Sequence, residues 1–498
     1  MIITKMNKFL LYINGELINA QGARVFDSLN PSTGEVFCQI ADANKDDMSS
    51  AIKAARDAFD SGVWSELSLE GRGRYLKRIA ELIRENAKEL ADIECKDIGK
   101  TTKQTTFIDI PTAAETFEYF SKIEKVLSDK ELQTDHPVKS IIVRDPIGVV
   151  GCTIPWNYPI IMAAWKIAPA LIAGNTVVLK PSSQGCASVM KLAELAKKAD
   201  LPSGVLNVVS TKDHNVAAML AASPDVDKFS FTGGTKTGQD VMRQAASNTK
   251  RLTLELGGKS PNIVFEDCDI EAAIGGTMSA IFMNQGQMCT AGSRLILSHK
   301  IYDEFLGKLV EKTKALKVGN AADYATDFGP LISKKHVESV LDYIKKGIKE
   351  GAKLLCGGKV PEGDEYKGGF YFEPAIFADV DNSMTIAQEE IFGPVLSVIK
   401  FSSEEEAIKI ANDSKYGLAA SVWTKDEKKA SSVARKLQCG TVWINTYGGF
   451  YNEAPFGGYK QSGFGRELGV EGLLEYTQCK HICIDKTPGG KPLVASWF

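Results

Sequence analysis

The sequence predicts an α/β protein with two lobes, each built on a mostly parallel, doubly wound sheet. Apolar strand-like runs alternate with helical patterns between residues 160 and 255, and a second such set runs from about 262 to 445. The chain has 498 residues, which is too long for one small domain and suits about two to four. There is no internal repeat or low-complexity linker, so we expect the lobes to pack together around a cleft.

The composition is typical of a soluble globular protein, with 44% apolar and 24% charged residues. The net charge of −3 gives no basic excess, so we expect neither nucleic acid nor a membrane surface as a partner. No apolar run reaches the roughly eighteen residues of a membrane span, and no signal peptide is evident. The ten cysteines form no CxxC pair and no zinc spacing. We therefore expect a cytoplasmic protein with free thiols and no metal site.

The elements follow in order along the chain. "FLLYINGELI" predicts a hairpin that turns at Asn14-Gly15, and residues 46–130 are expected to be mostly helical, with Asp46 or Asp47 capping the first helix. Strand-like alternation with prolines follows in residues 131–155. The remaining expected strands are 175–181, 204–210, 228–234, 251–258, 260–267, 293–298, 394–401 and 440–445, and the expected helices are 187–200, 236–247, 270–287 and 302–316.

Cys289 lies in "FMNQGQMCTAGSR", a run of small and polar residues. A thiol attacks only as the thiolate, so a nucleophilic cysteine needs a helix N-terminus, a cation or local dipoles. Gly286 and Gly292 flank it and would let a substrate approach closely. On spacing alone, a buried structural cysteine at a helix–loop junction explains the stretch slightly better.

Glu255 is a lone acid between Leu254 and Leu256 in an otherwise apolar strand. Desolvation there would raise the pKa of its carboxyl group and make it a usable base near neutral pH. An outward-facing strand residue that shares a face with Thr253 explains it equally well.

Two further stretches suggest binding. Asn157 lies in "PWNYP", a rigid loop whose amide N–H could serve an oxyanion hole, although an Asn that closes a turn fits as well. In "FSFTGGTKTG", residues 229–238, a strand runs through a glycine-rich turn into a helix, where backbone amides could cradle a pyrophosphate. The spacing is not GxGxxG, so this signal alone is weak.

Taken together, these stretches resemble the NAD(P)-dependent aldehyde dehydrogenase superfamily, essentially end to end. Within it the chain is most similar to the betaine aldehyde dehydrogenase-like branch. The motifs that carry the resemblance are "PWNYPIIMAAWKIAPAL", "FTGGTKTG", "LELGGKSPNIVF", "NQGQMCTAGSR", "EEIFGPV", "YGLAASVW" and "PFGGYKQSGFGRE".

The resemblance implies a Rossmann-like cofactor domain, an α/β catalytic domain and a small oligomerisation arm. The NAD(P)-binding domain would comprise residues 1–123 and 143–254, the catalytic domain 255–450, and the arms 124–142 and 477–498. Family members assemble as dimers or as tetramers, so we expect self-association, as a homotetramer or a dimer. The aromatic end Trp497-Phe498 also favours a docked tail.

The catalytic roles are likewise implied by the resemblance. Cys289 would attack the aldehyde to form a thiohemiacetal, with the oxyanion held by the Asn157 side chain and the Cys289 N–H group. Hydride transfer to the nicotinamide leaves a thioester, and Glu255 would activate the water that hydrolyses it. Lys166 and Glu467 match a buried pair that carries the proton outward. Because Glu255 is present, we expect the free acid rather than transfer to coenzyme A.

The resemblance also assigns the cofactor site, with Lys180 at the adenosine ribose and Glu390 and Phe392 at the nicotinamide end. Many NAD-preferring members carry Glu where this chain has Ser183, so we expect NADP to be accepted alongside or ahead of NAD. Gly234 replaces a common serine. The full set is Ile154, Pro155, Trp156, Lys180, Ser182, Ser183, Phe231, Thr232, Gly233, Gly234, Leu256, Glu390 and Phe392.

The substrate assignment rests on the walls of the pocket. Tyr158 and Trp165 match two walls of an aromatic box that binds a quaternary ammonium by cation–π attraction. Met283 and Phe456 replace its two tryptophans. We therefore expect betaine aldehyde, an ω-aminoaldehyde or another apolar or aromatic aldehyde. The alternatives are a succinic-semialdehyde-type NADP-dependent enzyme, a cofactor-independent thiol esterase as a side activity, or a binding protein without chemistry. The pocket residues are Tyr158, Trp165, Met283, Met288, Thr290, Tyr451 and Phe456.

Overall fold

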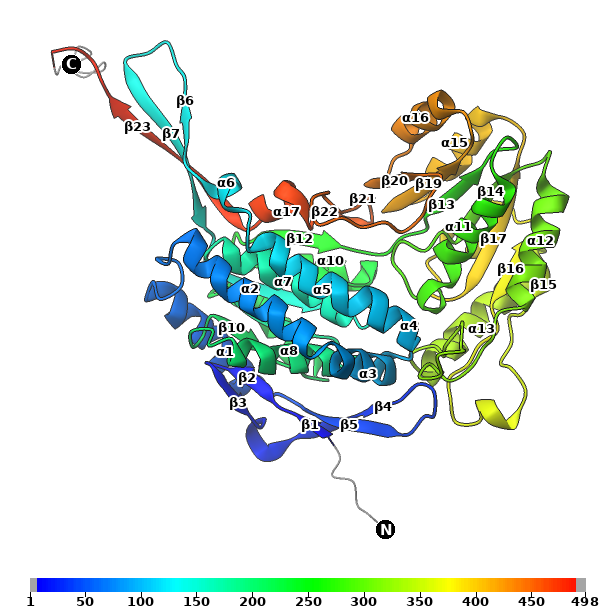
Figure 1. The fold of residues 1–498 in the computed structure, drawn as a ribbon, viewed down its shortest axis with the longest axis horizontal. Coiled ribbons are helices and arrows are strands. Elements are labelled where there is room, and N and C mark those ends of the chain that lie inside the picture. Colours follow the sequence, from blue (N-terminus) through cyan, green and yellow to red (C-terminus); the bar gives the residue numbers. More distant parts are fainter. Residues whose placement is uncertain (1–6, 490–498) are drawn as a thin grey trace.

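The computed structural model describes residues 7–489 and is dominated by two large sheets (Figure 1). The first has eight strands in the order β22-β12-β11-β8-β9-β10-β2-β3, and β8 to β12 run parallel. Its strands are β2 (Leu11–Ile13), β3 (Glu16–Ile18), β8 (Val149–Ile154), β9 (Thr176–Pro181), β10 (Leu206–Val208), β11 (Lys228–Thr232), β12 (Arg251–Glu255) and β22 (Gly463–Phe464).

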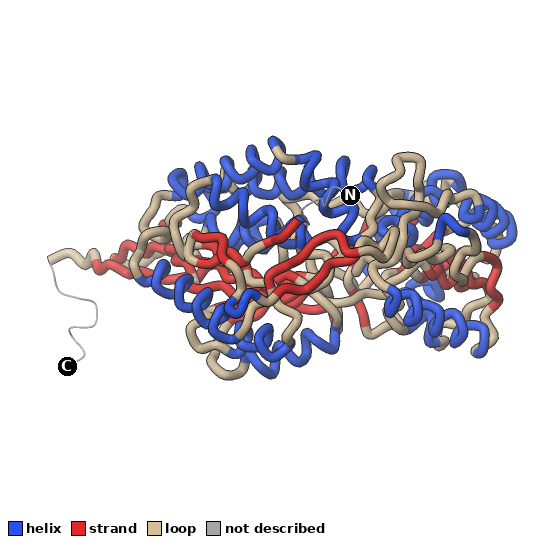
Figure 2. The backbone as a smooth tube through the Cα atoms, turned by 90° about the horizontal axis from the view of Figure 1, so that it is seen from below, coloured by secondary structure: helices blue, strands red, loops and turns tan. Residues whose placement is uncertain are grey.

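Helices cover both faces of this sheet, and Figure 2 shows the strands as a central layer between them. One face carries α1 (Lys45–Asp60), α9 (His214–Ala222) and α10 (Thr235–Ala245). The other carries α7 (Pro159–Ile172) and α8 (Ala187–Lys198), which are packed in turn by α2 (Leu69–Glu85), α3 (Ala87–Ile98) and α5 (Ile110–Phe120). This is the predicted doubly wound arrangement.

The second sheet has seven strands in the order β15-β16-β17-β14-β13-β19-β20, all parallel to their neighbours except β15. They are β13 (Pro261–Val264), β14 (Arg294–Ser298), β15 (Lys353–Cys356), β16 (Ala375–Ala378), β17 (Val395–Phe401), β19 (Ala419–Trp423) and β20 (Thr441–Ile444). Its helices are α11 (Ile270–Phe282), α12 (Tyr302–Lys314), α13 (Lys334–Lys349), α14 (Thr385–Gln388), α15 (Glu404–Asn412) and α16 (Glu427–Lys436).

Segments far apart in sequence form a projecting arm (Figure 1). Here β23 (Thr477–Asp485) pairs antiparallel with β7 (Val138–Pro146), which also pairs with β6 (Lys130–Leu132). The smaller elements elsewhere are β1 (Asn7–Phe9), β4 (Val25–Leu29), β5 (Val36–Ala41), β18 (Tyr416–Gly417), β21 (Tyr459–Lys460), α4 (Thr102–Gln104), α6 (Glu124–Leu127), α17 (Gly469–Leu474), the 3₁₀ turns η1 (Gln21–Ala23), η3 (Met283–Gly286) and η4 (Asp364–Tyr366), and a π-helix, η2 (Thr105–Asp109).

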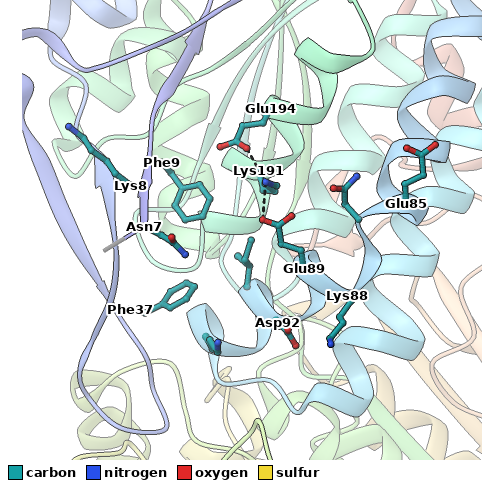
Figure 3. A pocket seen from close by; sticks show the side chains of 13 residues that line it. Asn7, Lys8, Phe9, Phe37, Glu85, Lys88, Glu89, Asp92, Lys191 and Glu194 are labelled. Carbon is teal, nitrogen blue, oxygen red and sulfur yellow. Dashed lines mark ion pairs between the residues drawn. The ribbon is translucent and has the colours of Figure 1, made fainter. Parts of the chain in front are cut away.

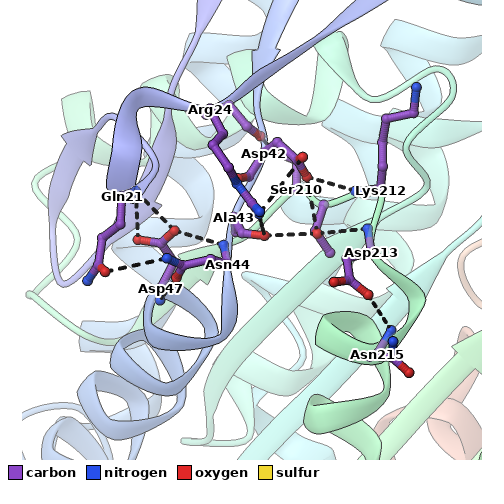
Figure 4. Close-up of polar contacts among 12 residues, drawn as sticks. Gln21, Arg24, Asp42, Ala43, Asn44, Asp47, Ser210, Lys212, Asp213 and Asn215 are labelled. Atoms are coloured by element: carbon purple, nitrogen blue, oxygen red, sulfur yellow. Dashed lines mark hydrogen bonds and ion pairs between the residues drawn. The ribbon is translucent and has the colours of Figure 1, made fainter.

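The predicted hairpin is confirmed, because β2 and β3 pair across Asn14 and Gly15, both at positive φ. The predicted cap is wrong. Asn44 caps α1, accepting the N–H groups of Asp46 and Asp47, and the Asp47 carboxylate accepts the Asn44 N–H in return (Figure 4). The Asp47 carboxylate of this capping box also accepts the Gln21 N–H, so Asp47 fixes the N-terminal segment on α1.

No helix within residues 7–489 combines the length and the apolar character needed to cross a bilayer. Trp497 and Phe498, which were expected to dock, lie outside the described residues. The predicted domain limit between 254 and 255 falls inside β12, since Glu255 is the last residue of that strand.

Candidate functional site

Residues predicted to bind the cofactor gather at the carboxyl ends of adjacent strands. Ile154 pairs with Pro181 at the ends of β8 and β9, and Thr232 pairs with Glu255 at the ends of β11 and β12. The strand order reverses between β8 and β11. Open α/β sheets bind ligands at such a switch point, so the sheet itself selects this edge.

A helix N-terminus points to the same edge. Gly234 is the N-cap of α10, which follows β11 after the Gly233-Gly234 turn. The Gly233 N–H is tied to the Glu255 carbonyl at 3.0 Å. The first N–H groups of such a helix favour a phosphate. The neighbours Phe231 and Leu256 are buried, whereas Pro155 is half-buried.

The predicted ribose residues follow β9. Lys180 pairs with Thr153 and is half-buried, and this burial lowers the pKa of its ammonium group, while the nearby Cys186 opposes the shift. Ser182 and Ser183 come directly after the strand and are also half-buried. No carboxylate occupies either serine position, so the sequence leaves space there for an extra anionic group.

The other end of this edge carries an aromatic cluster. Trp156 packs edge-on against Phe392, with ring centroids 5.4 Å apart. His336 lies 5.7 Å from Trp156, and its Nε2 is 2.8 Å from the Phe392 carbonyl oxygen. His336 was not predicted, and burial lowers the pKa of its imidazole. A neutral imidazole is suited to brace the two aromatic rings.

Glu390 is fixed beside this cluster by the backbone. The Gly258 N–H donates to its Oε1 at 3.0 Å. Burial raises the pKa of Glu390 to about 7, against the opposing effects of the Gly258 N–H and of Lys259. A Cβ on Gly257 would lie 2.1 Å from its Oε2, so a side chain at this position would displace the Glu390 carboxylate.

Cys289 is half-buried just after η3. Burial raises the pKa of its thiol to about 12, and the carboxylates of Glu390 and Glu255 add to the rise. The groups that lower it are backbone amides, including that of Thr290, rather than a cation. The only groups that favour the Cys289 thiolate are therefore backbone dipoles, and the thiol is protonated at neutral pH.

The segment that follows Glu255 is in direct contact with the loop that carries Cys289. A Cβ on Gly258 would lie 2.3 Å from the Cys289 carbonyl oxygen, so only glycine permits this approach. Glu255 thus ends a strand of the first sheet, Cys289 lies in the loop before β14 of the second, and the segment that follows Glu255 contacts the Cys289 loop where the chain crosses between the sheets.

Asn157 is held by long-range hydrogen bonds beside the thiol loop, residues 283–289. Its Nδ2 donates to the Gln287 carbonyl at 2.9 Å, and its own carbonyl accepts from Asn284 Nδ2 at 3.0 Å. Asn284 and Gln285 both have positive φ, 47° and 56°. The side chain of Asn157 therefore fixes the thiol loop instead of merely closing its own turn.

Glu255 is buried, with an exposed fraction of 5%, so the outward-facing interpretation is wrong. Neither carboxylate oxygen has a hydrogen-bond partner among the described residues. Burial raises the pKa of Glu255 well above its usual range, Glu467 adds to the rise, and Lys166 and Arg466 oppose it. A carboxyl group in this state is a base whose strength depends on its charged neighbours.

Lys166 and Glu467 form a buried ion pair, with Nζ and Oε1 2.5 Å apart. Ser230 Oγ accepts from Lys166 at 2.8 Å and is contacted by Thr253 at 3.0 Å and by the Tyr476 hydroxyl at 3.5 Å. Ser230 and Tyr476 were not predicted. They join β11 and the C-terminal segment around the ion pair.

The predicted substrate-pocket residues divide into two groups. Trp165 and Phe456 are buried, with ring centroids 5.5 Å apart, and Phe450 packs on both. Met288 and Thr290 are also buried, whereas Tyr158 and Met283 are half-buried. Tyr451 is 66% exposed and, with Phe450, lines an open cavity of about 530 Å³ that also includes Glu115, Glu118 and Glu453.

A different cavity, of about 610 Å³, opens between β1, α3 and α8 (Figure 3). Its charges are matched, because Lys191 bonds Glu89 at 2.9 Å and Glu194 at 3.1 Å. None of the predicted site residues lines it. The carboxyl edge of the first sheet is therefore the candidate active site.

Comparison with known proteins decides the family. The family model described as "Aldehyde dehydrogenase family" matches residues 17–482. The chain belongs to this family. It is 46% identical to the betaine aldehyde dehydrogenase of Bacillus subtilis over 98% of this chain and 99% of that protein. It is 43% identical to the human mitochondrial aldehyde dehydrogenase, over 95% and 91%.

Solved aldehyde dehydrogenases share the fold. The betaine aldehyde dehydrogenase of Staphylococcus aureus in complex with NAD+ matches with a TM-score of 0.95 and 41% identity, over 98% of this chain and 96% of that one. The NAD+ complex of a Bacillus cereus aldehyde dehydrogenase matches with 0.94 and 42%, over 96% and 97%. The predicted aldehyde dehydrogenase fold is confirmed, and the protein is an oxidoreductase of this family.

Proposed function

We propose that this aldehyde dehydrogenase oxidises an aldehyde to its carboxylic acid through a covalent intermediate on Cys289. The observation that carries the proposal is the convergence of three side chains from separate parts of the chain. Asn157 bonds the thiol loop at Gln287, and the segment after Glu255 contacts the Cys289 carbonyl through Gly258. A nucleophile, an oxyanion donor and a base thus share one edge of the sheet.

Each residue has a definite task. The Cys289 thiol first gives its proton to the ionised Glu255 carboxylate, from which Lys166 and Glu467 carry it away. Cys289 Sγ then attacks the carbonyl carbon as the thiolate, and the second N–H of Asn157 Nδ2, with the Cys289 N–H, holds the oxyanion. A nicotinamide cofactor, when bound, accepts the hydride. Glu255 then takes a proton from the water that hydrolyses the thioester, and its raised pKa makes it a stronger base than an ordinary carboxylate. Lys166 and Glu467 relay that proton outward.

The residues present fit a nicotinamide dinucleotide. The α10 N-terminus suits its pyrophosphate, Lys180 its adenosine ribose, and Glu390 with Phe392 its nicotinamide end. The NAD+ complexes of similar proteins support NAD. Ser183 in place of an acid supports NADP as well. A preference for NAD above about a hundredfold in kcat/KM, or ~2.7 kcal/mol, contradicts NADP use.

For the substrate we propose betaine aldehyde, an ω-aminoaldehyde or another apolar or aromatic aldehyde. Aromatic rings at Tyr158, Trp165 and Phe456 support this class. So do the acids Glu115 and Glu453 at the rim, since they attract a cationic substrate. Fast turnover of succinic semialdehyde, with none of these aldehydes oxidised, would reverse this assignment.

We also assign residues 1–123 and 143–254 to cofactor binding, 255–450 to catalysis and the arm to self-association as a dimer or tetramer. The arm supports its role by exposing apolar side chains at Leu132, Ile482 and Ile484. We place the reaction in the cytoplasm, which is supported by ten cysteines that are all free.

The test uses the purified full chain, a panel of aldehydes and both cofactors, with absorbance followed at 340 nm. Cys289→Ala should abolish oxidation. Cys439→Ala is the matched control, because Cys439 is also half-buried and free, and it should retain activity. Oxidation at an unchanged rate by Cys289→Ala would refute the mechanism. Ester hydrolysis without cofactor, in the absence of aldehyde oxidation, would support the esterase instead.

A further inference from the structure

The ion pair that relays protons from Glu255 does not itself reach solvent, since Lys166 is 1% exposed and Glu467 3%. Oxidation of an aldehyde by NAD(P)+ and water to a carboxylate releases two protons. One comes from the Cys289 thiol and one from the water, and the acid product returns its own proton to the thiolate. Glu255 takes both protons in turn, so it must be emptied within each turnover. The protons therefore need a route from the buried pair to the surface.

A polar stripe on one face of the first sheet leads away from Glu255. Side chains on one face of a strand repeat every second residue, and residues paired in register share that face. Six polar residues of β11 and β12 form this stripe, as the pairs Lys228–Arg251, Ser230–Thr253 and Thr232–Glu255. The stripe thus runs from Glu255 at the carboxyl edge, where the candidate active site lies, to Lys228 at the amino edge.

Ser230 lies in the middle of the polar stripe and contacts the ion pair. Its Oγ is 2.8 Å from Lys166 Nζ and 3.3 Å from Glu467 Oε1. Thr253 Oγ1 and the Tyr476 hydroxyl lie 3.0 Å and 3.5 Å from the same atom. Because a hydroxyl group both donates and accepts, Ser230 is able to take a proton from one neighbour and pass its own to another.

Lys228 ends the stripe in a state that stability alone does not explain. Its side chain is 0% exposed, and its Nζ makes no hydrogen bond to the residues that the structure describes. Glu475 Oε2 lies 3.8 Å from this Nζ, and the Glu475 side chain is 32% exposed. A buried ammonium group without a hydrogen bond destabilises a fold. Lys228 therefore stands between the buried stripe and a carboxylate that reaches solvent.

The charge of Lys228 is suited to proton exchange. Burial lowers the pKa of its ammonium group to about 8, while the charges of Glu475 and Glu467 oppose the shift. Such a group gains and loses its proton near neutral pH, whereas an ordinary lysine keeps it. Glu467 Oε2 also lacks a hydrogen bond among the described residues, so both ends of the gap between the ion pair and Lys228 have capacity for one.

We propose that Ser230, Lys228 and Glu475 carry protons from this ion pair to solvent at the amino edge of the first sheet. Ser230 and Lys228 are two residues apart along β11, about 7 Å, a gap that one hydrogen-bonded water bridges. Neutral Lys228 takes a proton through this water and passes one to the Glu475 carboxylate, which releases it to solvent. Every group returns to its starting charge after each proton.

This inference rests on the proposed function and deepens it, because it gives the relay an end point. The aldehyde and the cofactor occupy the carboxyl edge, so the protons leave at the opposite edge. Hydrolysis of the thioester then needs no opening of the substrate side to solvent.

A single turnover separates the two uses of Glu255. The first hydride transfer requires only that Glu255 accept the thiol proton, whereas hydrolysis requires that Glu255 be emptied first. The measured quantities are the rate of the absorbance burst and the rate at which the acylated enzyme then decays, followed by rapid quenching. A loss of folded protein lowers the amplitude of the burst and leaves both rates unchanged.

Glu475→Ala should slow hydrolysis at least about fivefold and leave the burst rate unchanged. The substitution leaves space for a small carboxylate, so formate should restore hydrolysis. Chloride balances the charge of Lys228 but accepts no proton, so it should not. Lys228→Met should slow hydrolysis as well, without rescue by formate, because a thioether carries no proton. It leaves no charge buried, since Glu475 is partly exposed.

Glu194→Ala is the matched control. Glu194 is 28% exposed and pairs at 3.1 Å with the less exposed Lys191, in the cavity that none of the predicted site residues lines. This variant should keep both rates and should not respond to formate.

Hydrolysis within about twofold of wild type in both Glu475→Ala and Lys228→Met would overturn the inference. Equal rescue of Glu475→Ala by chloride would overturn it too, because the pair would then serve only to balance charge. If the wild-type protein oxidises no aldehyde in the panel, the proposed function fails. If it oxidises them and hydrolysis in the variants is unchanged, only the proton exit fails.

Discussion

The Lys166–Glu467 ion pair offers two substitutions with opposite expected effects on the base. Lys166 is 1% exposed and Glu467 3%, with the charged atoms 2.5 Å apart. Removing one partner leaves a buried charge and should cost about 3–5 kcal/mol of stability. Lys166→Met/Glu467→Gln leaves none and should cost less than either single change.

The same substitutions should move the pKa of Glu255 in opposite directions. The Glu467 charge raises that pKa and the Lys166 charge lowers it. Glu467→Gln should therefore lower the pKa of Glu255, and Lys166→Met should raise it further. Because only the ionised carboxylate accepts a proton, the acidic limb of thioester hydrolysis moves to lower pH in Glu467→Gln and to higher pH in Lys166→Met.

The assay separates hydrolysis from hydride transfer. A single turnover is started with aldehyde and cofactor, and release of the acid is followed across the pH range after the burst at 340 nm. Unfolding in urea gives the stability of each variant. Limbs that move in the same direction, or do not move, refute the coupling to Glu255. A double variant less stable than both single variants refutes the ion-pair argument.

Three further predictions concern other parts of the site. Glu255→Gln should lose hydrolysis yet stabilise the fold at alkaline pH. The pKa of Glu255 is raised in the folded state, so its contribution to stability is present below the ordinary Glu pKa and is lost as the pH rises. Urea unfolding at pH 4 and pH 8 should therefore show that the variant is more stable than wild type only at the higher pH. Asn157→Ala should reduce kcat by about 10²–10³ with cofactor affinity unchanged, and an equal loss of cofactor affinity in a titration would contradict the oxyanion role. Ser183→Glu should shift the NAD over NADP ratio of kcat/KM at least about tenfold toward NAD, and no shift would show that this position does not face the ribose.

The alternation of strands and helices predicted the parallel core of the first sheet and four of the seven strands of the second, because buried parallel strands are short apolar runs between helices. It missed β15, β16 and β19, and it did not predict α7. Every residue of α7 except Met162 is buried, so the helix lacks the polar face that gives an amphipathic period. The loop expected around Asn157 therefore ends two residues later, where α7 begins at Pro159.

The candidate site divides along similar lines. Cys289, Glu255 and Asn157 stand in unusual local sequence, which made them candidates, and the family resemblance then assigned their roles. His336 and Ser230 carry no such local signal. Each acquires its place only through packing against residues distant in the chain, such as Trp156 and Lys166. A spacing rule cannot find contacts of that kind.

The crossing between the two sheets has a consequence for how robust the active site is. Glu255 ends β12 and Pro261 begins β13, so residues 256–260 form the whole connection. Within it, Gly258 lies against the thiol loop and also anchors Glu390. This short covalent connection thus limits the distance between the base and the nucleophile. Substitutions on the outer surfaces of either lobe should leave the distance between Glu255 and Cys289 unchanged, whereas one residue inserted between 256 and 260 should alter it.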